Sequence, residues 1–86
     1  MPRISEFYGI VISMYYADHE PPHFHAMYGE YRVRISIDPL VAMDRGFPLR
    51  ALRLVEEWAS IHQDELQANW ERARMRQPLR TIDPIP

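Results

Sequence analysis

The residues with the clearest capacity for chemistry lie close together in the first half of the chain. Three of the four histidines, His19, His23 and His25, are followed within a short distance by two arginines, Arg32 and Arg34. Imidazole exchanges a proton near neutral pH and binds transition metals. Guanidinium pairs with phosphate or carboxylate. The spacing therefore predicts either acid–base chemistry on an anionic group or a metal site.

A β-hairpin is the element that would position these side chains. The dipeptide Gly29-Glu30 separates two alternating runs, and glycine at the first central position is typical of a two-residue type II′ turn. The turn predicts strands over residues 23–28 and 31–37. It sets Tyr28 opposite Tyr31, Met27 opposite Arg32, Ala26 opposite Val33, His25 opposite Arg34, Phe24 opposite Ile35 and His23 opposite Ser36.

Side chains alternate along a strand, so the predicted hairpin has two different faces. The apolar face, which we expect to pack on the core, carries Phe24, Ala26, Tyr28, Tyr31, Val33, Ile35 and Ile37. The polar face, which we expect to stay open to solvent or to a partner, carries His23, His25, Met27, Arg32, Arg34 and Ser36.

The polar face suits a phosphate group. We expect His23 or His25 to act as general acid or base, and Arg32 and Arg34 to stabilise the charge on the phosphate. These four residues are the predicted catalytic set, and this chemistry needs no metal. The predicted binding residues around them are Asp18, His19 and Tyr28.

A metal site is the alternative for the same histidines. His23 and His25 project to one side of the strand, with Cα atoms about 6.5–7 Å apart. His19, beyond a Pro-Pro loop, would be the third ligand, and an adjacent carboxylate the fourth. The charge of Arg34 opposite His25 opposes a cation there. We therefore expect no cofactor, and a divalent transition metal on His19, His23 and His25 is the alternative.

Composition narrows the class of protein. The chain has 86 residues, a formal net charge of −2, and neither lysine nor cysteine. This length predicts a single domain, residues 1–86, and self-association is a further expectation for so small a core. The absence of cysteine excludes disulfides and thiolate metal sites. No apolar run is long enough to cross a membrane or to resemble a signal peptide, so we expect a cytoplasmic protein.

The remaining strands follow from composition and turn signals. Residues 1–5 are a lead-in, and the β-branched and aromatic run at residues 7–16 predicts one strand. Residues 17–22 are expected to form a loop. Residues 40–47 are either a loop or a short edge strand over residues 41–44. We therefore expect a three-stranded antiparallel meander, with that edge strand as the fourth if it forms.

A long C-terminal helix completes the predicted fold. It begins at Pro48 and runs to about Met75, with an apolar stripe at steps of three and four residues. The spacing from Ser60 to Gln63 matches a capping box. We expect one helix, bent if anything, and two helices that meet near His62 are the alternative.

The last residues, 77–86, are expected to form an extended Pro-rich tail, with Ile82 and Ile85 packed on the core. The predicted class is α+β, with the helix covering the apolar face of the sheet. The polar face is then left free for function.

Three stretches of the chain carry a resemblance to a known family. They are F-Y-G-I-V-I-S-M-Y-Y, D-H-E-P-P-H-F-H-A-M-Y-G and W-A-S-I-H-Q-D-E-L-Q-A-N-W. With them the chain resembles the bacterial domain-of-unknown-function family numbered 4160, from Arg3 to about Pro84. The resemblance implies a small bacterial protein encoded beside another small domain, in cassettes similar to type II toxin–antitoxin operons, with this domain in the toxin-like position. It implies no catalytic residues.

We therefore expect a toxin-like component of such a pair, acting on RNA or another phosphate-bearing target through the face that carries the histidines and arginines. The expected partners are an antitoxin-like neighbouring protein and RNA, and no membrane. A non-catalytic protein-binding module, or the antitoxin-like half of the pair, is the second interpretation. A small histidine-based metalloprotein is the third.

Overall fold

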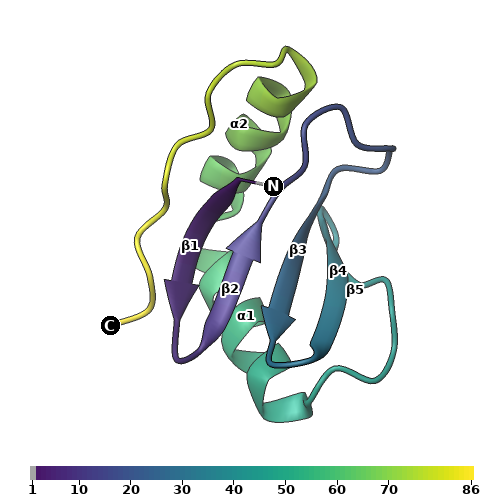
Figure 1. Cartoon of the computed structure of the whole chain (residues 1–86), viewed down its shortest axis with the longest axis vertical. Coiled ribbons are helices and arrows are strands. Elements are labelled where there is room, and N and C mark those ends of the chain that lie inside the picture. The colour runs from purple at the N-terminus through teal and green to yellow at the C-terminus, as the bar shows by residue number, and fades with distance from the viewer. Residues whose placement is uncertain (1) are drawn as a thin grey trace.

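A computed structural model describes residues 2–86 and contains a five-stranded antiparallel sheet with two helices behind it (Figure 1). The strands are β1 (Arg3–Phe7), β2 (Ile10–Ser13), β3 (His23–Tyr28), β4 (Tyr31–Ile37) and β5 (Leu40–Ala42), and the helices are α1 (Leu49–Ile61) and α2 (Gln63–Arg74). The strands lie in the sheet in chain order, each antiparallel to the next. The predicted α+β class is confirmed, although the sheet has more strands than expected.

The β3–β4 hairpin has the predicted register. All six cross-strand pairs are confirmed, including His25 opposite Arg34 and His23 opposite Ser36. Gly29 has a φ of 59°, which a type II′ turn requires at its first central position and which glycine adopts without steric cost. His23 and His25 therefore lie on one face of β3, with a distance of 5.1 Å between ring centroids.

The prediction of one strand over residues 7–16 is wrong. Tyr8 and Gly9 both have positive φ, 50° and 78°, and form a tight turn that joins β1 to β2. The expected lead-in thus contains most of β1. The apolar run over residues 7–16 shows no clear alternation, so no sequence signal marked the turn within it.

The prediction of a single C-terminal helix is also wrong, and the alternative of two helices is confirmed. His62 leaves the helical conformation, with φ −111° and ψ 24°. The Ser60 hydroxyl donates to the Glu57 carbonyl within α1, so it does not cap α2. Instead His62 Nδ1 bonds to Glu65 in the first turn of α2, where a carboxylate interacts favourably with the helix dipole.

The core lies between the sheet and the helices, as the apolar face of the hairpin predicted. Trp58 of α1 is fully buried, and its ring lies 5.4 Å from Phe7 and 5.9 Å from Phe24. Tyr28 and Tyr31 were also predicted to pack on the core, and this is wrong: they flank the hairpin turn and are exposed. Their end of the hairpin thus lies outside the packed region.

The tail after α2 is extended, as predicted, and runs beside β1 (Figure 1). The Ile82 backbone N–H donates to the Ile4 carbonyl, and the Ile82 side chain is buried. Asn69 of α2 is buried and bonds to both backbone groups of Arg80, while Trp58 donates its indole N–H to Asp83. These bonds hold the tail against the outer edge of the sheet.

Candidate functional site

Three side chains that can bind protons or metals converge at one end of β3. Asp18 Oδ2 lies 3.0 Å from His23 Nε2 and 3.1 Å from His25 Nε2. One candidate ligand atom from each of the three residues lies within 4.8 Å of the others. We refer to Asp18, His23 and His25 as the His–Asp cluster.

The β2–β3 loop carries Asp18 to the two histidines. At its start the Ala17 N–H donates to the Ala73 carbonyl at the end of α2, and at its end the Pro22 carbonyl accepts from Ile37 of β4. The Asp18 carboxylate also accepts a bond from the His19 backbone N–H. The loop is thus fixed to both layers of the fold, which holds the carboxylate over β3.

The two histidines differ in environment. The His23 side chain is only 4% exposed, because Trp70 of α2 lies against it with ring centroids 5.3 Å apart. The His25 side chain is 20% exposed and is contacted edge-on by Tyr15. The expectation that His23 lies on an open face is therefore wrong: it occupies the strand end, where α2 and the loop cover it. His25 is the histidine that solvent and ligands can reach.

The hydrogen bonds of His23 define its tautomer. Its Nδ1 lies 2.7 Å from the Pro21 carbonyl, which can only accept, so Nδ1 carries a proton. Its Nε2 faces Asp18 and, in the neutral ring, presents a lone pair. Of the two ring nitrogens, Nε2 is therefore the one without a backbone partner.

Local charges and burial shift the pKa values of the other two members. Burial lowers the pKa of His25, and this outweighs the opposing effect of the hydrogen bond that His25 donates to Asp18. Burial alone would raise the pKa of Asp18, but bonds from His25 and the His19 N–H outweigh it and the pKa is lowered. At neutral pH the cluster therefore contains a carboxylate and a neutral His25.

Arg34 is less available to an anion than the sequence suggested. Its Nε and Nη2 donate to the two oxygens of Asp44, at 3.0 and 2.7 Å, and its backbone N–H donates to the same carboxylate. These bonds lower the pKa of Asp44 to about 2. Arg32, by contrast, has no ion-pair partner within residues 2–86.

The Arg34–Asp44 pair should make a pH-dependent contribution to stability. Because Asp44 has a lower pKa in the folded state than its ordinary 3.8, the contribution is present above about pH 4 and is lost toward pH 2. We expect Asp44→Asn to lower the urea midpoint slightly at neutral pH, and the difference from wild type to shrink on acidification. A difference that stays constant down to about pH 3 would contradict this assignment.

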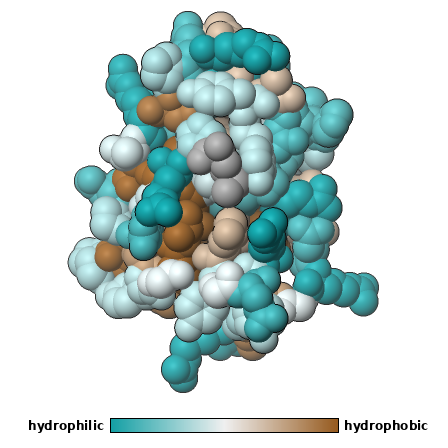
Figure 2. Space-filling view, in the orientation of Figure 1, coloured by the Kyte–Doolittle hydropathy of each residue, from teal (hydrophilic) through white to brown (hydrophobic). Residues whose placement is uncertain are grey.

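A pocket of about 270 Å³ adjoins the cluster on the sheet face away from the helices. It is lined by Tyr15, His25, Ala26, Met27, Arg32, Val33, Arg34 and Asp44, and we name it the His25 pocket. Figure 2 shows the same face of the molecule, with hydrophilic groups around a hydrophobic area over β1 and β2. The arrangement can place a ligand between an imidazole and two guanidinium groups.

The structure thus brings some predicted site residues together and not others. His23, His25 and Asp18 meet, and Arg32 and Arg34 line the adjoining pocket. His19 is exposed and outside the cluster, and Tyr28 lies on the opposite face of the sheet.

Sequence reasoning missed two neighbours of the site, Trp70 and Asp44. Trp70 lies 47 residues beyond His23 in the chain, on the apolar stripe that was assigned to the core. Asp44 lies in residues 40–47, a segment whose structure the sequence left open. No local pattern pointed to either contact.

Comparisons with known proteins place the chain in a family without adding a function. A family model described as Domain of unknown function (DUF4160) matches residues 9–71, well over half of the chain. No curated protein and no solved structure matches it. Within residues 2–86 neither helix is long and apolar enough to cross a membrane. The match covers the hairpin, both histidines of the cluster and Asp18, and the chain belongs to the DUF4160 family.

Proposed function

We propose that this protein is the toxin-like component of a two-protein pair and acts on RNA or another phosphate-bearing target in the His25 pocket. The observation that carries the proposal is that the His–Asp cluster meets this pocket through His25, the exposed member of the cluster. The gene arrangement that the family resemblance implies, in cassettes similar to type II toxin–antitoxin operons, supports the toxin-like role.

The pocket offers separate groups for binding and for chemistry. Arg32 is unpaired within the described residues, and Arg34 keeps Nη1 free while Asp44 occupies its other edge. These two guanidinium groups can hold a phosphate. The His–Asp cluster supplies the reactive centre beside it, in a partly buried site where electrostatic effects are stronger than in water.

Expression of the chain alone and beside its neighbouring gene tests this function. We expect growth to stop when the chain is induced alone and to recover when the neighbour is co-expressed. The purified protein should cleave or bind cellular RNA. Normal growth together with intact, unbound RNA would contradict the proposal.

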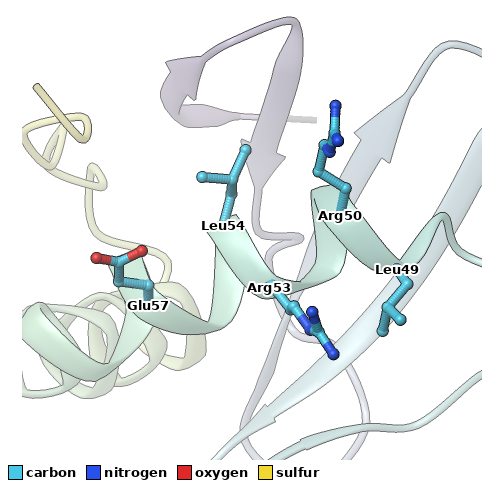
Figure 3. Close-up of a pocket in the computed structure, with 5 residues that line it drawn as sticks. All are labelled: Leu49, Arg50, Arg53, Leu54 and Glu57. Carbon is cyan, nitrogen blue, oxygen red and sulfur yellow. The ribbon is translucent and has the colours of Figure 1, made fainter.

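The outer face of α1 favours a second candidate, a module that binds a protein partner without catalysis. Leu49 is 61% exposed and, with Leu54, lines a surface pocket of about 430 Å³ that also includes Arg50, Arg53 and Glu57 (Figure 3). Arg50 and Leu54 point to one side of the helix, and Leu49 and Arg53 to the other (Figure 3).

Each side of the helix thus carries one leucine and one arginine, which suits an apolar segment with acidic residues. An antitoxin-like neighbour with such a segment is the occupant we propose. The co-expression experiment separates the two candidates. The binding module would be favoured if the chain forms a stable complex with the neighbour and expression of either protein leaves growth unchanged.

A further inference from the structure

We infer that Asp18, His23 and His25 form a binding site for one divalent first-row transition metal ion, with zinc and iron(II) as the chemical class. The catalytic role of the ion rests on the proposed function, because the ion would be the reactive group of the His25 pocket. The binding of the ion rests only on the geometry of the His–Asp cluster.

The spacing of the ligand atoms fits a shared ion. Bonds from such ions to imidazole nitrogen and carboxylate oxygen are about 2.0–2.2 Å long, so neighbouring ligands lie about 3.0–3.5 Å apart at tetrahedral or octahedral angles. The two Nε2 atoms lie 3.0 and 3.1 Å from Asp18 Oδ2. These two spacings match a shared ion, and all three ligand atoms lie within 4.8 Å of one another. The ion would replace the proton that His25 Nε2 shares with Asp18.

The orientation of His23 fits the same ion. Histidine ligands usually donate their second ring N–H to a carbonyl or carboxylate, which fixes the tautomer. His23 does so, through the bond from Nδ1 to the Pro21 carbonyl. The second ring nitrogen, Nε2, is then the one left for an ion, and it lies 3.0 Å from Asp18 Oδ2. An ion beside both atoms could bond to each of them.

The charges around the cluster also permit a cation. The sequence placed Arg34 opposite His25 and thereby argued against a metal. In the structure Asp44 bonds to that guanidinium through both carboxylate oxygens and so offsets part of its effect on a nearby cation. Tyr15 and Trp70, which contact the two imidazoles, are uncharged. The Asp18 carboxylate then gives the site its net attraction for a metal.

The ligand set indicates what the ion would do. Two imidazoles and one carboxylate are the ligands of catalytic zinc and of non-haem iron sites, in which the other positions are open to water or substrate. Metal coordination lowers the pKa of water enough to form a nucleophile near neutral pH. Because His25 borders the pocket, such a water would stand beside a phosphate held by Arg32 and Arg34.

Metal titration of the untagged protein tests the site directly. After removal of metal with EDTA, we expect one Zn²⁺ per chain by calorimetry and one Co²⁺ per chain, with visible absorption bands from bound cobalt. Asp18→Asn and His25→Ala should each weaken binding by at least about 10-fold. His62→Gln is the matched control, since His62 contacts Trp58 and Glu65 rather than the cluster.

The proposed metal site would be overturned if neither ion binds. It would also be overturned if binding survives both Asp18→Asn and His25→Ala, or if binding is lost in His19→Ala. His23 is buried against Trp70, so its replacement tests the fold as well as the site, and the other two ligands carry the test.

Failure of the site and failure of the proposed function are distinguishable. Stoichiometric metal in a protein that neither stops growth nor acts on RNA keeps the site and overturns the function. RNA cleavage that continues in excess EDTA keeps the function and overturns the catalytic role of the ion.

Discussion

Replacement of His25 by alanine is expected to lower the rate of RNA cleavage by about 10²–10⁴-fold and to abolish growth arrest. His25 is the only member of the His–Asp cluster that lines the His25 pocket, so its imidazole stands between the reactive centre and any ligand. The rate should be measured with the purified variant on total cellular RNA, and growth after induction of the same variant.

The matched control is His62→Gln, which removes a histidine at the junction of α1 and α2. It should retain cleavage and growth arrest, provided that circular dichroism shows a folded protein. Arg32→Ala should weaken RNA binding, since Arg32 is the cation of the pocket without an ion-pair partner among the described residues. A His25→Ala variant with full activity would show that the reactive centre lies elsewhere.

The second large effect is on stability, and we expect it from replacement of Trp58, the core position where substitution should destabilise the fold most. Trp58→Ala should lower the free energy of unfolding by about 3–5 kcal/mol, because it removes one of the two largest buried side chains and leaves a cavity between the sheet and α1. Small domains are stable by about 5–15 kcal/mol, so much of the margin would be lost. Urea denaturation followed by circular dichroism measures the change.

Trp58→Phe gives the matched comparison. It keeps most of the contact with Phe7 and Phe24 but loses the indole N–H that donates to the Asp83 carbonyl. We expect a smaller loss than for alanine, together with faster proteolysis of the tail. Equal stabilities of the wild type and Trp58→Ala would show that the tail and sheet do not depend on this contact.

The extended C-terminal tail contributes to the stability of the fold through hydrogen bonds to two buried side chains. Asn69 and Trp58 are both buried, and each binds a backbone group of the tail. A buried polar group that loses its partner costs about 1–3 kcal/mol, so detachment of the tail is unfavourable at two places. The free edge of β1 is thereby covered by the chain itself.

The local elements were predictable wherever one signal dominated. Gly29 between two alternating runs fixed the register of the β3–β4 hairpin, since a shift of one residue would turn every apolar side chain to the wrong face. The turn at Tyr8-Gly9 was missed because the run over residues 7–16 is apolar on both faces and therefore shows no clear alternation around the turn. At His62 the apolar stripe continues through the break, so periodicity alone could not separate α1 from α2.

The sequence by itself determined that His23 and His25 share one face of a strand, because alternation and turn geometry are properties of neighbouring residues. Only the tertiary structure decided what surrounds them. The β2–β3 loop placed Asp18 between the imidazoles, α2 buried His23 under Trp70, and Asp44 occupied Arg34. These contacts join segments that are distant in the chain or separated by irregular loops. Their geometry depends on how the layers pack, and no local spacing encodes it.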